Sequence, residues 1–458
     1  MPIGSIPNFC GIDLGTTNST VAIVQNNQPL ALPIDPDNSN PRILKSLVYL
    51  NPQHRIEVGE KAISAYLWDL NNIPSLPPKI VNTGRLIKTF GPSTGSGAGP
   101  PIWVPEIIEV DDSGRGRLLQ SLKSVLTSDT FAGTNLFGKY YSLEDLLALL
   151  LNQIKNRAEN LLNHSLNHVV LGRPVRYVGN IAKEKLALAR MKNIARKSGF
   201  QTVKFEYEPV GAALAYGLNL LESQKVIVFD FGGGTLDICI VEFPSKKILS
   251  VSGRAIGGDL VNSRLVRGKL LKHFGQDVII SAKTNLPRYL VDSISQNWYQ
   301  VSLLKTVKNI QAMDYFITNA DHPAPVINLR DFIINDLGFN FFNTVDLAKI
   351  DLSDHLQTLF QFTLPQTQIN QPLARIDLEN LVRDLVCESE ECLKEALTQA
   401  SLTPTQIDKV ILTGGSSKIP IFLSQITQKF GHEKIVHSDP FTTVALGLAL
   451  RAQEVFGS

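Results

Sequence analysis

The 458-residue chain has no run of about 18 consecutive apolar residues, so we expect no membrane span. Its first residues, MPIGSIPNFCGIDLG, contain neither a basic leader nor an apolar segment of signal-peptide length. Charge of one sign is not in excess either, because 44 basic residues face 42 acidic ones and the net charge is only +2. This balance gives no electrostatic reason to expect nucleic acid or an anionic membrane as a partner.

Cysteine is scarce. The four cysteines are Cys10, Cys239, Cys387 and Cys392. They form no CxxC motif, and no histidine lies near them at the spacing of a zinc site. We therefore expect free thiols in a reducing compartment, which indicates the cytoplasm.

The strongest organising feature is an internal repeat of one plan, in FCGIDLGTTNSTVAIV (residues 9–24) and VIVFDFGGGTLDICIV (226–241). In each, an apolar strand ends in Asp, a Gly-rich turn with Thr follows, and a second apolar strand leads away. Short apolar runs that flank Gly clusters are typical of β-hairpins. Two such hairpins about 200 residues apart predict two lobes of similar build.

Between and after the hairpins the pattern alternates helices and strands. We expect a helix capped at Ser142 (142–162), a strand in HVVLGRPV, helix 180–197, strand 203–207, a small-residue helix after Glu208-Pro209, helix 377–400, strand 410–413 and a helix from Pro420. Residues 91–101, GPSTGSGAGPP, are typical of a flexible surface loop. Residues 314–374 fit no clear pattern, and we expect the edge of an inserted subdomain there.

The two Gly-rich turns meet the requirements for binding a nucleoside triphosphate. Backbone N–H groups approach phosphate oxygens closely only where glycine frees the chain, and a carboxylate holds magnesium through its water shell. The residues that fit are Asp13, Gly15, Thr16, Thr17, Asp230, Gly232, Gly233, Gly234 and Thr235. A third Gly-rich turn, LTGGSSKIP (412–420), opens a helix whose dipole favours anions. Each turn alone could be an ordinary tight connection.

The sequence contains no GxxxxGK[ST] motif, so a P-loop enzyme is disfavoured. Instead GIDLGTTNS, EPVGAALAYGL, FDFGGGTLD and VILTGGSSKIP resemble, from about residue 9 to about 450, the signature segments of the 70-kDa heat-shock (DnaK-type) chaperone ATPase. GRPVRY resembles the segment of that family around a proline that relays the nucleotide state.

This resemblance implies an α/β, actin-like ATPase fold, with two lobes that each hold a mixed β-sheet flanked by helices and a nucleotide cleft between them. We expect lobe I to take residues 1–220 plus 440–458. Lobe II would take 222–437, with an inserted subdomain at about 260–375. No substrate-binding domain is expected, as in the short YegD-like members of the family.

The resemblance also assigns roles to residues. Asp13 and Asp230 would hold the magnesium water shell, and Glu208 and Asp237 would orient water near the γ-phosphate. The other implied nucleotide-binding residues are Gly15, Thr16, Thr17, Asn18, Gly232, Gly233, Gly234, Thr235, Gly257, Gly258, Gly414, Gly415, Ser416 and Lys418. The lysine that the family places beside the γ-phosphate is Lys123 or, as the rival candidate, Lys88.

Two departures affect adenine recognition. We assign the adenine-binding helix to LLKTVKNIQAM (303–313), which keeps only Lys305 and Lys308 of the residues that the family presents there. Phe441 stands where the family places an acidic residue. The nucleotide preference is therefore left open by the sequence.

The function indicated is a slow, magnesium-dependent ATPase with ATP/ADP as nucleotide and a chaperone-related task. The partner would be an unfolded polypeptide or a separate client-binding co-chaperone, and the chain is expected to be a monomer. Three alternatives remain: a nucleotide sensor with little turnover, a small-molecule kinase that uses Asp237 or Glu208 as a base toward a sugar hydroxyl, and a filament-forming actin relative.

Overall fold

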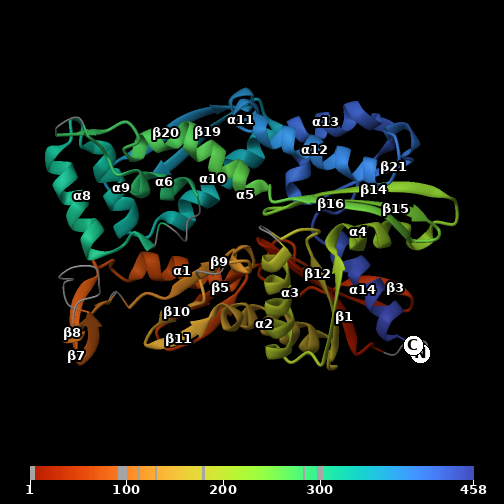
Figure 1. Ribbon diagram of the computed structural model, residues 1–458, viewed down its shortest axis with the longest axis horizontal. Helices are drawn as coiled ribbons and strands as arrows, with labels where there is room; N and C mark the ends of the chain where they lie inside the picture. The colour runs from red at the N-terminus through yellow and green to blue at the C-terminus, as the bar shows by residue number, and fades with distance from the viewer. Residues whose placement is uncertain are drawn as a thin grey trace.

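The computed structural model describes residues 6–90, 101–110, 114–128, 131–177, 181–281, 284–296, 301 and 303–457. Figure 1 shows two lobes, one above the other, each with a β-sheet and covering helices. The N-terminal half of the chain forms most of the lower lobe, which we call lobe I, and the C-terminal half forms most of the upper lobe, lobe II. The actin-like architecture is thus confirmed.

The sheet of lobe I has the order β13-β12-β1-β2-β3. Its strands are β1 (Phe9–Leu14), β2 (Asn18–Gln25), β3 (Gln28–Ala31), β12 (His168–Arg173) and β13 (Thr202–Tyr207), with β4 (Leu44–Lys45) paired to β2. Side chains alternate between the faces. Cys10 and Ile12 pack with α2 (Leu143–Leu162) and α3 (Ile181–Lys197), whereas Phe9 packs with α4 (Glu208–Tyr216) and α14 (Thr443–Phe456).

The sheet of lobe II repeats that plan in the order β16-β15-β14-β21-β22. Its strands are β14 (Gln224–Phe231), β15 (Leu236–Phe243), β16 (Lys247–Arg254), β21 (Lys409–Thr413) and β22 (Ile435–His437). In both sheets the first hairpin is antiparallel, a third strand extends it antiparallel, and two further strands pair in parallel. Both predicted hairpins, and the internal repeat that they form, are confirmed.

The remaining elements extend each lobe. Lobe I adds β5 (Leu47–Leu50), β6 (Ile56–Val58), α1 (Glu60–Asn72), β7 (Lys79–Phe90), β8 (Pro101–Val110), β9 (Arg117–Gln120), β10 (Gly133–Leu136) and β11 (Lys139–Ser142). Lobe II adds α5 (Gly258–Leu265), β17 (Ile279–Ile280), β18 (Thr284–Asn285), α6 (Arg288–Asp292), α8 (Val307–Asn319), α9 (Ala324–Ile334), α10 (Gly338–Asp354), β19 (Gln357–Thr363), β20 (Gln368–Ala374), α11 (Arg375–Leu381), α12 (Arg383–Gln399) and α13 (Pro420–Phe430). No helix in the described part of the chain is both long and apolar enough to cross a membrane.

Several local expectations are confirmed and one is wrong. The Ser142 side chain accepts the N–H of Asp145 and the Asp145 side chain accepts the N–H of Ser142, so the capping box forms. The predicted helix 377–400 is two helices, α11 and α12, because the backbone leaves helical geometry at Val382 (φ −110°, ψ 13°). Residues 314–374 contain most of α8 together with α9, α10 and the β19–β20 hairpin. The flexible loop expected at 91–101 lies, except for residue 101, outside the described residues.

Helices α4 and α14 cross at two glycines. A Cβ atom at Gly447 would lie 1.6 Å from the carbonyl oxygen of Gly211, and one at Gly211 would lie 3.0 Å from that of Val444. The two backbones therefore touch, and the contact fixes how α14 lies between the sheets.

We expect Gly447→Ala to lower the free energy of unfolding by about 3 kcal/mol, the upper end of the overpacking range, since backbone must move to admit the methyl group. Urea unfolding measures this change. Gly415→Ala is the control for stability, because its Cβ would meet no atom within 4 Å. Equal loss in both variants would contradict the close crossing.

Candidate functional site

The turns of the two hairpins face each other across a cavity of about 1000 Å³, mouth included, between the lobes. Of the predicted site residues it is lined by Asp13, Gly15, Thr16, Thr17, Asn18, Lys123, Glu208, Asp230, Gly232, Gly233, Gly234, Thr235, Gly414 and Gly415. Residues from five separate segments thus meet at one place. The hairpin plan brings this about, because each first strand ends at the same edge of its sheet.

Glycine is required where the two turns touch. A Cβ atom at Gly233 would lie 2.5 Å from the hydroxyl oxygen of Thr17, and one at Gly234 would lie 3.1 Å from that of Thr16. Gly257 packs behind this turn, where a Cβ would lie 2.2 Å from the carbonyl oxygen of Gly233. Only bare backbone allows the lobes to approach this closely.

A buried ion pair joins Lys123 to Glu208, with 2.6 Å between Lys123 Nζ and Glu208 Oε1. Lys123 lies in a 3₁₀ turn (Leu122–Val125) just before α2, and Glu208 is the first residue of α4. Burial opposes the charge of the Lys123 ammonium, but Glu208, Tyr177 and Asp13 outweigh it and raise the pKa of that group. The rival Lys88 is exposed on β7 and does not line this cavity.

Carboxylates surround this single ammonium. Lys123 is the only cation among the described residues that line the cavity, against Asp13, Glu208 and Asp230. Burial, and then the charge of Glu208, raises the pKa of Asp13 from 3.8 to about 7. The same two causes raise the pKa of Asp230 well above its ordinary value. The site therefore carries more negative charge than its protein partners neutralise, which fits a cation as ligand.

The donor set fits magnesium in particular. In the described part of the chain no three His, Cys, Asp or Glu side chains gather closely enough to hold a metal directly. Magnesium dehydrates reluctantly and is commonly held by one or two carboxylates together with substrate phosphates. Asp13 and Asp230, one from each lobe, match that pattern.

Asp237 lies behind the cavity and does not line it. It is fully buried on β15 opposite Asp230, and its Oδ1 accepts the backbone N–H of Val175 at 2.6 Å. Burial, and then Glu208, raises the pKa of Asp237 to about 7. The direct role at the γ-phosphate expected for Asp237 is therefore corrected, because its carboxylate bonds to the loop that follows β12.

A second, adjoining cavity shares Thr17, Asn18, Gly232, Gly233 and Gly415 with the first. Gly258 and Ser416 line it, and both contact Gly232, whose carbonyl oxygen accepts the N–H of Gly258 at 3.0 Å and the hydroxyl of Ser416 at 2.9 Å. Phe441 lines both cavities. The expected places of Gly258, Ser416 and Phe441 near the nucleotide loops agree with this arrangement.

The helix that lines the second cavity is α10, not the segment 303–313. Asp346, Lys349 and Ile350 of α10 face the cavity, and Lys349 Nζ pairs with Asp346 Oδ1 at 2.5 Å. The signal was present in DLAKIDLS (346–353), where Asp, Lys and Ser recur at i, i+3 and i+7, one face of a helix. The search stopped at the lysines of 303–313 and missed it.

Three residues expected at the nucleotide lie elsewhere. Lys305 is buried against Asp336 and Ser75, Lys308 is exposed on α8, and Lys418 is exposed at the end of the 3₁₀ turn Gly415–Lys418. None of the three is among the described residues that line either cavity. Their assignment to the nucleotide is corrected.

Comparison with known proteins agrees with this site. A family model described as Hsp70 protein matches residues 118–292 and 340–457. Over 449 residues the chain is 25% identical to a protein named chaperone protein dnaK from Cyanidioschyzon merolae, covering 98% of this chain and 62% of the relative. Over 456 residues it is 25% identical to chaperone protein DnaK from Thermosipho melanesiensis, covering 98% of this chain and 59% of the relative. The chain thus spans about three fifths of the length of these relatives.

The raised pKa of Asp237 predicts a pH-dependent stability. The folded chain binds this proton more tightly than the unfolded chain, so the stabilisation is present below about pH 4 and is lost as the pH rises through about 7. In the nucleotide-free chain, Asp237→Asn should flatten the fall of unfolding free energy across this window, by up to ~1.4 kcal/mol per pH unit. Urea unfolding at pH 5, 6, 7 and 8 measures it. Asp37→Asn, at an exposed position, is the control, and parallel profiles for Asp237→Asn and the parent would show the explanation to be wrong.

Proposed function

The chain belongs to the Hsp70 protein family, and we propose that its interlobe cavity binds magnesium-ATP and slowly hydrolyses it to ADP and phosphate. One observation carries this proposal: Gly-rich turns from both lobes and the Lys123–Glu208 pair converge on a single cavity with an excess of buried carboxylates. Phosphoryl transfer needs positioning and charge stabilisation more than covalent chemistry from the protein.

The phosphates would lie against the turns Gly15–Asn18 and Gly232–Thr235. Backbone N–H groups and the hydroxyls of Thr16, Thr17 and Thr235 supply donors there, while the glycines keep side chains out of the way. Asp13 and Asp230 would hold the magnesium through its water shell. When bound, the metal neutralises negative charge on the phosphate oxygens.

Lys123 and Glu208 would act together beside the terminal phosphate. Lys123 Nζ keeps its charge in a buried place because Glu208 Oε1 holds it at 2.6 Å, so the ammonium is fixed where negative charge develops. Glu208 also lines the cavity and can orient the attacking water and accept its proton. Asp237 would support them indirectly, by fixing the loop of Val175, since Pro174 and Tyr177 of that loop line the same cavity.

The base would occupy the second cavity. It shares Thr17, Asn18 and Gly232 with the phosphate cavity, so a nucleotide can extend from one to the other. Asp346 and Lys349 of α10 offer an acceptor and a donor for its polar edges or for the ribose, and Phe441 offers a ring at the junction.

A chaperone-related task follows from the same family membership. ATP contacts both turns, so gain and loss of the terminal phosphate would change the fit between the lobes. We propose that this change is communicated to a polypeptide client, either directly or through a separate client-binding protein.

Lys123→Ala tests the catalytic proposal. Phosphate release from magnesium-ATP should fall by about 10²–10³-fold, the usual loss when one preorganised donor is removed, while ATP affinity changes little. Single-turnover phosphate release and equilibrium binding measure the two effects. Lys88→Ala is the matched control and should release phosphate at the parent rate. Tight ATP binding by the parent chain without any release would favour a nucleotide sensor instead.

Lys349→Ala tests the place of the base. We expect roughly tenfold weaker ADP binding, the consequence of losing about 1.4 kcal/mol of contact to the nucleoside. Calorimetric titration measures it. Lys308→Ala, on the segment first assigned to adenine, should leave ADP affinity unchanged. The reverse outcome would return the adenine site to residues 303–313.

A further inference from the structure

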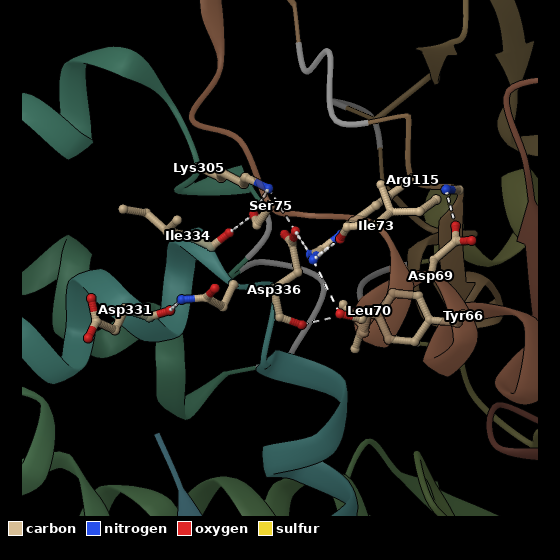
Figure 2. Close-up of polar contacts among 12 residues, drawn as sticks. Tyr66, Asp69, Leu70, Ile73, Ser75, Arg115, Lys305, Asp331, Ile334 and Asp336 are labelled. Carbon is tan, nitrogen blue, oxygen red and sulfur yellow. Dashed lines mark hydrogen bonds and ion pairs between the residues drawn. The ribbon is translucent and has the colours of Figure 1, made fainter. Parts of the chain in front are cut away.

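The two lobes meet a second time at the end of the molecule where α1 lies below α8 and α9 (Figure 1). Figure 2 shows polar side chains of both lobes pointing toward one another there. Lobe I supplies Tyr66, Ser75 and Arg115, and lobe II supplies Lys305, the carbonyl of Ile334, and Asp336. We call these six residues the interlobe clasp.

Asp336 is the centre of the clasp. Its Oδ2 accepts Lys305 Nζ at 2.7 Å and lies 3.5 Å from Arg115 Nη1, and its backbone carbonyl accepts the hydroxyl of Tyr66 at 2.9 Å. Ser75 forms the other crossing. Its hydroxyl donates to the carbonyl of Ile334 and accepts Lys305 Nζ at 3.1 Å.

The charges of the clasp are buried. The exposed fraction of the side chain is 2% for Lys305, 9% for Arg115 and 14% for Asp336. Charges withdrawn from water in this way are held in place by their partners, since an unpaired one is costly. Charge pairing is therefore retained only while the lobes stay together at this end or while water replaces the lost partner.

Each half of the clasp is also ordered within its own lobe. Arg115 donates to the carbonyl of Ile73 from Nε at 2.9 Å and from Nη2 at 2.6 Å, and these bonds lie in lobe I. The Lys305–Asp336 pair lies in lobe II. Separation of the lobes therefore leaves both halves preformed, which suits a contact that opens and closes repeatedly.

The clasp lies in the part of the chain that the family model does not match. The matched residues are 118–292 and 340–457, and all six clasp residues fall outside them. The clasp also adjoins the second cavity, because Phe339 of α10 packs edge-on against Tyr66 at 5.7 Å and lines that cavity. A device particular to this chain therefore borders the place proposed for the nucleotide.

We propose that the interlobe clasp is a latch that keeps the lobes closed and limits the rate at which nucleotide leaves. At the opposite end the lobes share an apolar core, in which Phe9 and Val170 of lobe I pack with Val226 and Val228 of lobe II. That end acts as the hinge and the clasp as the opening edge. The part concerning nucleotide rests on the proposed function, whereas the closure of the lobes does not.

The test uses near-isosteric changes, because Asp336→Asn would leave two buried cations short of a partner and endanger folding. The double variant Tyr66→Phe, Ser75→Ala removes hydroxyls that cross between the lobes. The matched control is Tyr49→Phe, which removes the 2.5 Å hydrogen bond from a buried tyrosine to Asp69 entirely within lobe I.

The first readout is the separation of the lobes without nucleotide. Cys387 on α12 is an exposed thiol, and Cys10, Cys239 and Cys392 are buried. A second label site, Tyr140→Cys, lies at an exposed position on β11. Energy transfer between dyes at these two sites should fall in the double variant and stay at the parent value in Tyr49→Phe.

The second readout is the dissociation rate of a fluorescent ADP analogue. It should rise about tenfold in the double variant, equivalent to about 1.4 kcal/mol of lost interlobe contact. Unchanged energy transfer in a folded double variant would overturn the latch. Altered energy transfer with an unchanged dissociation rate would overturn its control of release. Should no variant bind the analogue, the proposed function fails, and energy transfer alone still decides whether the clasp holds the lobes together.

Discussion

The centre of this molecule is a single buried ammonium among carboxylates. Lys123 pairs with Glu208 at 2.6 Å, and Asp13 and Asp230 line the same cavity from opposite lobes. One positive charge does not neutralise three negative ones in a water-poor place, so protons or a bound cation must supply the difference. The raised pKa values of Asp13 and Asp230 are the apo expression of this imbalance, and a magnesium–phosphate ligand is its chemical complement.

The rest of the fold holds that charge cluster between two bodies that can move. Each lobe ends a strand of the same sheet plan at the cavity, and the turns touch only because Gly233 and Gly234 have no side chains. On one side the lobes share an apolar core beside the α4–α14 crossing, and on the other they meet through the polar clasp around Asp336. Apolar packing tolerates small rotations, whereas buried ion pairs are either made or broken. A hinge and a latch follow from that difference.

Much of the site followed from local sequence because its chemistry is local. A Gly-rich turn after an Asp-ended strand dictates both its backbone freedom and its donors, and two such turns with one plan predicted two like lobes. Lys123 followed from its place ahead of the helix that begins after Ser142. Lys305, Lys308 and Lys418 did not, because a lysine in a helical segment looks the same to a sequence pattern whether it faces a ligand, an aspartate or solvent.

The sequence by itself determined the two hairpins, the capped helix at Ser142 and the set of loops that meet nucleotide phosphates, since strand periodicity, capping and glycine placement act over a few residues. Only the tertiary structure decided that α10 lines the second cavity, that Asp237 bonds to the loop of Val175, and that Lys305 joins Asp336 and Ser75 between the lobes. Those partners lie between 31 and 230 residues apart in the chain. Contacts over such separations depend on how whole lobes pack, and no short pattern encodes them.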